Sequence, residues 1–210
     1  MKRLFTVLVL SVTLQACSGS VEENKENGKA AASTQSNTQS GLPAELEPKN
    51  IAHYEEKLDV AKISQALKNA GFEKGEQKEA EWNRRLAAVT TNEEVQAVVR
   101  DQLMYYRQAE QELSAINTVS QQGTQVRQKM LNGFSGMCRI LEIMQKLDMT
   151  SPEGAVQLNE LNPKIKEYGT EIMQGLQLFV QLVKESGQSY NKKAEAKMQG
   201  KLKELEGKLE

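Results

Sequence analysis

The feature that most constrains the fold is an apolar repeat that runs from Val95 to Leu147. Apolar or small side chains recur there in fifteen steps between positions 95 and 147, a mean of about 3.5 residues a step. This heptad spacing predicts one long, gently supercoiled helix of about 80 Å. Gly123, Gly133 and Gly136 interrupt the pattern, and they can mark a bend, a one-turn break or the close approach of another helix.

A second helical pattern begins at the boundary Thr150-Ser151-Pro152-Glu153. Serine is a good N-cap and proline is tolerated in a first helical turn. The connection is too short for anything but an antiparallel return, which carries apolar positions at helical spacing as far as Val183. Pro163 predicts a kink or a restart within this helix.

Two shorter helices are predicted before the long one. The first runs from about 51 to Gly71 and the second from about 76 to 89 around Trp82, and Thr91 with Glu94 marks the next helix start. Only 5% of the residues are aromatic, which disfavours strands. We therefore expect an all-α domain over 51–210, an elongated antiparallel bundle or coiled-coil-like hairpin, with an exposed amphipathic tail helix over 187–210.

The chain opens with a basic and then apolar segment over residues 1–16. Lys2 and Arg3 precede an apolar run of about eleven residues, and a membrane-spanning helix needs about 20. The segment therefore has the features of a secretory signal peptide. Its ending, Leu14-Gln15-Ala16-Cys17, resembles the lipobox of bacterial lipoproteins.

That resemblance implies cleavage between Ala16 and Cys17, and a diacylglycerol group with an N-acyl chain, such as palmitate, on Cys17. Two or more acyl chains anchor a protein stably in a membrane. Ser18 in place of Asp then implies the outer membrane, with the domain facing the periplasm. The alternative is an ordinary secreted protein. Residues 17–50 contain almost no large apolar residue, so we expect a disordered tether spanning roughly 30 Å.

Composition limits the chemistry of the mature chain. Removing residues 1–16 lowers Lys plus Arg from 27 to 25 against 28 Asp plus Glu, a net charge of -3 that argues against nucleic acid as a partner. His53 is the single histidine, so a metal site of several His and Cys is not expected. Cys138 is interpreted as a small buried hydrophobe, with an intermolecular disulfide as the alternative.

Candidate contacts for a protein partner come from two groups of residues. Tyr105 and Tyr106 cannot both face the heptad seam, so Tyr105 is predicted to be exposed beside Arg107. Met130, Phe134 and Met137 lie at core spacing, but they would form an adaptable binding surface if the bundle left them uncovered.

These features predict a non-enzymatic outer-membrane lipoprotein that binds another periplasmic protein as an accessory of an envelope system. No cofactor is expected beyond the lipid on Cys17, and a homodimer is compatible with the pattern. One alternative is an immunity protein against a periplasmic toxin. Another is a structural spacer between the outer membrane and the cell wall.

Overall fold

The structure of the protein is a computed structural model that describes residues 53–187 and residue 200. The signal peptide, Cys17, the tether and nearly all of the predicted tail helix lie outside the described residues. Within those residues the chain is helical and forms no strand, which confirms the all-α bundle. The elements are α1 (Tyr54–Asn69), the 3₁₀ turn η4 (Phe72–Lys74), α2 (Gly75–Ala88), α3 (Asn92–Ala115), α4 (Gln121–Met144) and α5 (Pro152–Glu185).

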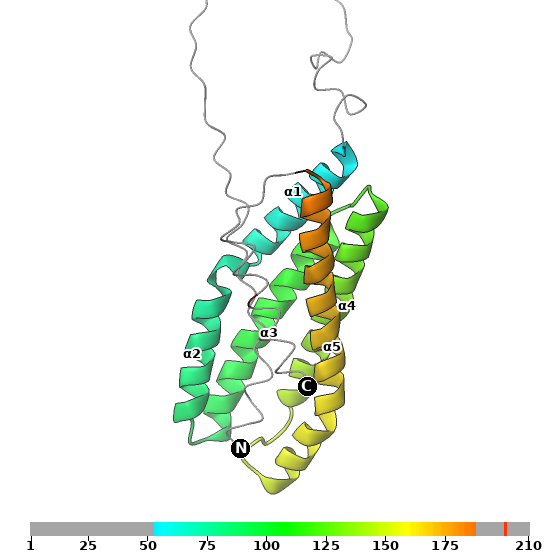
Figure 1. The fold of residues 1–210 in the computed structure, drawn as a ribbon. Coiled ribbons are helices and arrows are strands. Elements are labelled where there is room, and N and C mark those ends of the chain that lie inside the picture. The colour runs from blue at the N-terminus through cyan, green and yellow to red at the C-terminus, as the bar shows by residue number, and fades with distance from the viewer. Residues whose placement is uncertain (1–52, 188–199, 201–210) are drawn as a thin grey trace, which may run out of the picture.

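The three long helices α3, α4 and α5 run alongside one another and alternate in direction (Figure 1). The shorter α1 packs against all three of them, near the end of the bundle where α3 turns into α4. The helix α2 lies at one edge and packs against α3. The bundle core therefore sits among α1, α3, α4 and α5.

The continuous helix predicted over 95–147 is wrong. In the structure α3 ends at Ala115, Ile116 is extended with φ −88° and ψ 144°, and α4 begins after Ser120. The Ser120 side chain caps α4 by accepting a hydrogen bond of 2.9 Å from the amide of Gly123. A heptad pattern survives such a reversal, because each half keeps its own apolar face toward the same core.

The predicted boundaries at Gly71, Thr91 and Ser151 agree with the structure. Gly71 ends α1 with φ 80°, a conformation that glycine adopts without steric cost. Thr91 and Glu94 form a reciprocal capping box at the start of α3. Ser151 caps α5, and Pro152 occupies its first turn. The predicted antiparallel hairpin at this boundary is therefore confirmed as the pair α4 and α5.

The glycines of α4 mark places where other elements come close. A Cβ atom on Gly133 would lie 2.8 Å from the backbone nitrogen of Ile172 and from the carbonyl oxygen of Tyr168 in α5. From the opposite side, a Cβ on Gly175 would lie 3.0 Å from the Met130 nitrogen. Of the three alternatives for these glycines, close approach of another helix is the one that the structure supports.

The helix α5 passes through Pro163 without a break, so the restart predicted there does not occur. The ring of Pro163 is exposed to solvent, while Ile165, two residues later, is buried. Packing of the apolar stripe against α4 maintains the helix although Pro163 supplies no backbone N–H.

Candidate functional site

Tyr105 is partly buried against η4 and α2 rather than exposed, so its predicted exposure is wrong. Its ring stacks on Phe72 at 5.3 Å between centroids and meets the ring of Trp82 at 5.4 Å. Phe72 belongs to the turn before α2, so this turn covers the side of α3 that carries Tyr105. Burial is the main cause that raises the pKa of Tyr105 above its ordinary value. The sequence pattern did not reveal this second buried face of α3.

Arg107 remains on the surface as predicted, but it has a partner. Its guanidinium forms an ion pair with Glu142 across the α3 and α4 helices. Both side chains are nearly half exposed, so this pair contributes little to stability. The Arg107 side chain is exposed to solvent, whereas the Tyr105 side chain is only partly exposed.

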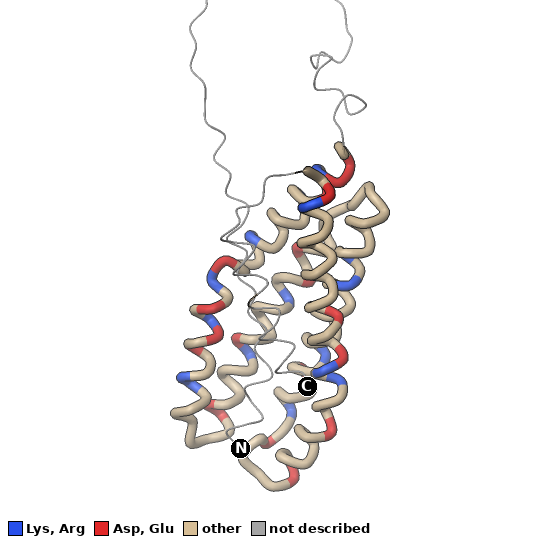
Figure 2. The backbone as a smooth tube through the Cα atoms, in the orientation of Figure 1, with Lys and Arg blue, Asp and Glu red and all other residues tan. Residues whose placement is uncertain are grey.

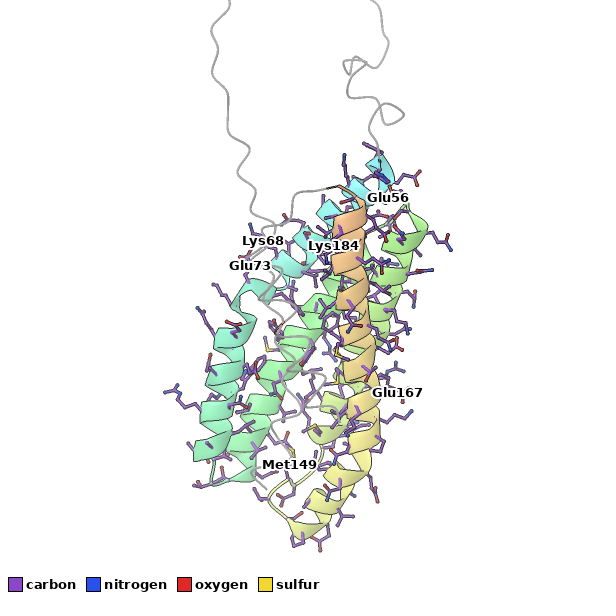
Figure 3. The ribbon with its side chains drawn as sticks, viewed as in Figure 1. Glu56, Lys68, Glu73, Met149, Glu167 and Lys184 are labelled. Atoms are coloured by element: carbon purple, nitrogen blue, oxygen red, sulfur yellow. The ribbon has the colours of Figure 1, made fainter. Side chains whose placement is uncertain are left out.

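Met130, Phe134 and Met137 belong to the core, and each has a relative exposure of 0%. They pack in the cluster that joins α4 to the other long helices, so the core interpretation is confirmed and the uncovered surface is not formed. Met104, in contrast, has 72% exposure on the outer side of α3. Met149, at the connection between α4 and α5 (Figure 3), is buried like Met130 and Met137.

Cys138 is buried in α4, as interpreted from its apolar neighbours. Burial, followed by the charge of Glu110, raises the pKa of the Cys138 thiol from 9.0 to about 12. The thiol therefore stays protonated at neutral pH and behaves as a small apolar side chain. His53, the other candidate for reactivity, is exposed at the start of α1 with its Nδ1 atom 3.9 Å from a Glu56 oxygen.

A buried carboxylate joins α1 to the turn between α3 and α4. Asp59 has 0% exposure, and its oxygens accept hydrogen bonds from the backbone amides of Val119 and Ser120 at 2.8 to 3.1 Å. The Ser120 hydroxyl donates a further bond of 2.7 Å. Gly123 leaves the space for this carboxylate, because a Cβ there would collide with it. The Asp59 carboxylate therefore has several hydrogen-bond donors inside the protein, and it is not accessible to a ligand from solvent.

The surface of the α4 and α5 hairpin carries a group of uncharged amide side chains. No charged residue occurs between Glu171 and Lys184 in α5, and that stretch of the tube is tan in Figure 2. The neighbouring first half of α4 contributes further amides. We define the amide face by its exposed members: Gln121, Gln122, Gln125, Gln128, Asn132, Gln177 and Gln181.

A shallow groove of about 110 Å³ crosses the amide face between α4 and α5. Gln122 and Gln125 line one side, Leu178 and Gln181 the other, and Glu185 closes one end. Sequence reasoning missed this surface, although the long uncharged run in α5 was a signal for it. The two charged residues nearest to it in α4 are engaged elsewhere: Lys129 pairs with Glu171 at 2.9 Å, and Arg127 donates to the Leu113 carbonyl at 2.8 Å.

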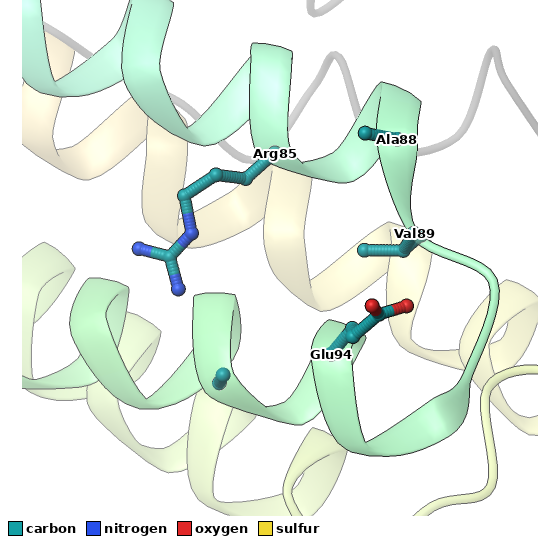
Figure 4. A pocket seen from close by; sticks show the side chains of 5 residues that line it. Arg85, Ala88, Val89 and Glu94 are labelled. Atoms are coloured by element: carbon teal, nitrogen blue, oxygen red, sulfur yellow. The ribbon is translucent and has the colours of Figure 1, made fainter.

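A second pocket lies where the end of α2 faces the start of α3 (Figure 4). Its volume is about 270 Å³, and Arg85, Ala88, Val89, Glu94 and Ala97 line it. The carboxylate of Glu94 is already used in the capping box, and Arg85 is paired with Asp101. The charged side chains of this pocket therefore have structural partners.

Among the described residues, no group of three or more His, Cys, Asp or Glu is arranged to hold a metal ion. None of the described helices is long and apolar enough to cross a membrane. No known protein-family model matches this chain, and no curated protein or solved structure is significantly similar to it. The fold defines the class of protein as an all-α antiparallel bundle.

Proposed function

We propose that this protein is a non-enzymatic outer-membrane lipoprotein that binds another protein in the periplasm, as an accessory of an envelope system. The lipobox-like sequence at Cys17 supports the anchor, and the polar segment after it supports a tether. The single observation that carries the binding role is the amide face with its groove. The centres of protein interfaces are depleted of charged residues. Among the described residues that line the groove, Glu185 alone is charged, and Gln122 and Gln181 donate hydrogen bonds to it.

The amide face replaces the predicted contacts as the proposed binding surface. Met130, Phe134 and Met137 are buried in the core. The Tyr105 ring is partly buried against Phe72 and Trp82. Amide side chains donate and accept hydrogen bonds, and Leu178 adds apolar area to the lining of the groove. A helix or extended segment of a partner, with few charges of its own, suits such a surface.

Site-specific photo-cross-linking in living cells tests the proposal. A photoreactive residue is placed at Gln125 or Gln181 in the groove, and at Gln77, which is exposed on α2, as the control. We expect one protein adduct of constant mass from the two groove positions and none from Gln77. Equal adducts at all three positions, or recovery of cell-wall fragments alone, would contradict the proposal.

A charge-insertion variant provides the second test. Gln125→Glu places a negative charge in the groove without changing the size of the side chain. We expect at least a tenfold loss of the adduct at Gln181, because a buried unpaired charge at an interface costs more than about 1.4 kcal/mol. Gln77→Glu is the matched control and should leave the adduct unchanged. The urea midpoint of both variants, followed by far-UV circular dichroism, should equal that of the parent.

A further inference from the structure

The helix α2 is attached to the bundle by a narrow contact. Only Gly75 and Trp82 are buried among its 14 residues. Trp82 packs with Val98, and with the partly buried Leu86 and Tyr105, in a small cluster. Leu86 and Tyr105 are also its links to the main core. The contact between α2 and α3 therefore depends largely on one indole ring.

Three buried polar atoms at this contact have no hydrogen-bond partner: Trp82 Nε1, Gln102 Nε2 and the Tyr105 hydroxyl. Trp82 and Gln102 each have 2% exposure. Gln102 lies one helical turn from Val98 and from Tyr105, on the stripe of α3 that faces α2. An indole or amide N–H donates and a tyrosine hydroxyl donates and accepts, and in the closed packing none of these groups has a hydrogen bond to another protein atom.

The connections at both ends of α2 allow it to move. Gly71, with φ 80°, and the 3₁₀ turn precede it, and Gly75 is its first residue. Val89, which is extended, and the two following threonines separate it from α3. The ion pair of Arg85 with Asp101 links the two helices, but these side chains are 31% and 44% exposed, and such surface pairs contribute little.

We propose that α2 is a hinged cover that leaves α3 as a unit while the rest of the bundle stays folded. Opening returns water to the three unpartnered polar atoms and uncovers the stripe of Val98, Gln102 and Tyr105. Opening removes Leu86 from the surface of the main core, but none of the buried residues of that core lies in α2. This inference concerns α2 and α3, whereas the amide face lies on α4 and α5, so it does not depend on the proposed function.

Trp82 is the single tryptophan of the protein, so its fluorescence reports on α2 alone. In a urea titration of the full chain, we expect the Trp82 emission to shift to the red at about 1 M lower urea than the loss of far-UV circular dichroism. Amide hydrogen exchange in α2 should also be about 100-fold faster than in the buried turns of α4 and α5. Coincident transitions with equal exchange protection would overturn the proposal and indicate that ordered water satisfies the three atoms.

A pair of glutamine variants of α3 tests the cause of the opening. Gln102→Leu removes one unpartnered buried donor and should move the Trp82 transition to higher urea, toward the transition of the whole bundle. Gln111→Leu, at an exposed position of the same helix, is the matched control and should leave the Trp82 transition where it is. A Gln102→Leu protein whose Trp82 transition falls to lower urea would contradict the role given to this donor. If Gln102→Leu does not fold, the hydrogen-exchange comparison in the parent protein decides.

Discussion

The Asp59 carboxylate and the Tyr105 hydroxyl are both buried polar groups, and they differ in whether they have hydrogen-bond partners. The Asp59 carboxylate accepts several hydrogen bonds from one turn, so its burial holds α1 against the α3 and α4 connection. The Tyr105 hydroxyl has no partner, although its ring contacts three other aromatic rings. A buried polar group stabilises a contact only when its hydrogen bonds are replaced.

Replacement of Asp59 by Ala should lower the free energy of unfolding by about 3 kcal/mol, because two backbone amides and a hydroxyl lose their acceptor inside the protein. Urea unfolding followed by far-UV circular dichroism measures this change. Glu55→Ala, an exposed carboxylate of the same helix, is the control and should change stability by less than about 0.5 kcal/mol. Equal effects of the two substitutions would show that the turn does not depend on Asp59.

Cys138 should be unreactive toward thiol reagents in the folded protein, because burial raises the pKa of its thiol to about 12. With Cys17 replaced by Ser, a colourimetric thiol titration at pH 8 should detect no thiol until denaturant is added. The folded pKa lies above the unfolded one, so the contribution of this group to stability is complete below pH 9.0 and is lost as the pH rises toward 12. Rapid labelling without denaturant would contradict the buried position.

At the scale of the helix, the hairpin of α4 and α5 depends on the absence of side chains at the crossing. Gly133 and Gly175 allow the two backbones to approach within contact of each other. Glycine lowers helix propensity relative to alanine, and at these two positions the close packing of the helices offsets that cost. The same helices present the amide face on their outer side.

Gly133→Ala should destabilise the protein by about 2 kcal/mol, although alanine favours a helix, because the added Cβ collides with the backbone of α5. Asn132→Ala, at the neighbouring exposed position, should change stability by less than about 0.5 kcal/mol. Thermal and urea unfolding by circular dichroism measure both variants. A Gly133→Ala protein more stable than the parent would show that the helices are free to separate.

Pro163→Ala should stabilise the protein by about 1 to 3 kcal/mol. The helix already continues through this exposed position, so alanine restores a backbone hydrogen bond and removes no packing contact. The same unfolding measurements apply, with Lys164→Ala as the neighbouring control. An unchanged or lower stability would mean that the proline has a structural role that the continuous helix does not reveal.

For the molecule as a whole, the proposed function combines a lipid anchor, a tether and a helical bundle. The anchor and tether are proposed from sequence, while the bundle supplies a groove between the start of α4 and the end of α5, lined by Gln122, Gln181 and Glu185. The hinged α2 lies at another edge of the bundle (Figure 1). A partner bound at the groove would therefore leave α2 free to open.

Cys17→Ala should release the protein from the membrane fraction or leave it unprocessed, because the acyl chains are proposed to attach to this thiol. Fractionation of cells, followed by immunoblotting, measures the distribution and the size of the product. Ser18→Ala is a control that keeps the thiol and should leave the protein in the membrane fraction. A Cys17→Ala protein that is cleaved normally and stays in the membrane fraction would contradict lipid anchoring.

The local signals of the sequence were enough to predict most element boundaries and the fold class. Gly71, Thr91 and Ser151 act through hydrogen bonds and dihedral preferences within a few residues, so their positions alone indicated where helices begin and end. The apolar repeat likewise determined the all-α class and the core role of Met130 and Phe134. Each of these features depends only on spacing along the chain.

Only the tertiary structure decided where the long repeat reverses and which of its neighbours are covered. The reversal at Ile116 to Ser120 is stabilised by Asp59, a residue about 60 positions away, and no local pattern reports such a contact. Tyr105 packs against Phe72 and Trp82 from another segment, and the groove of the amide face is lined by residues of two helices, α4 and α5. Periodicity reveals that a face is apolar, whereas long-range packing determines what covers it.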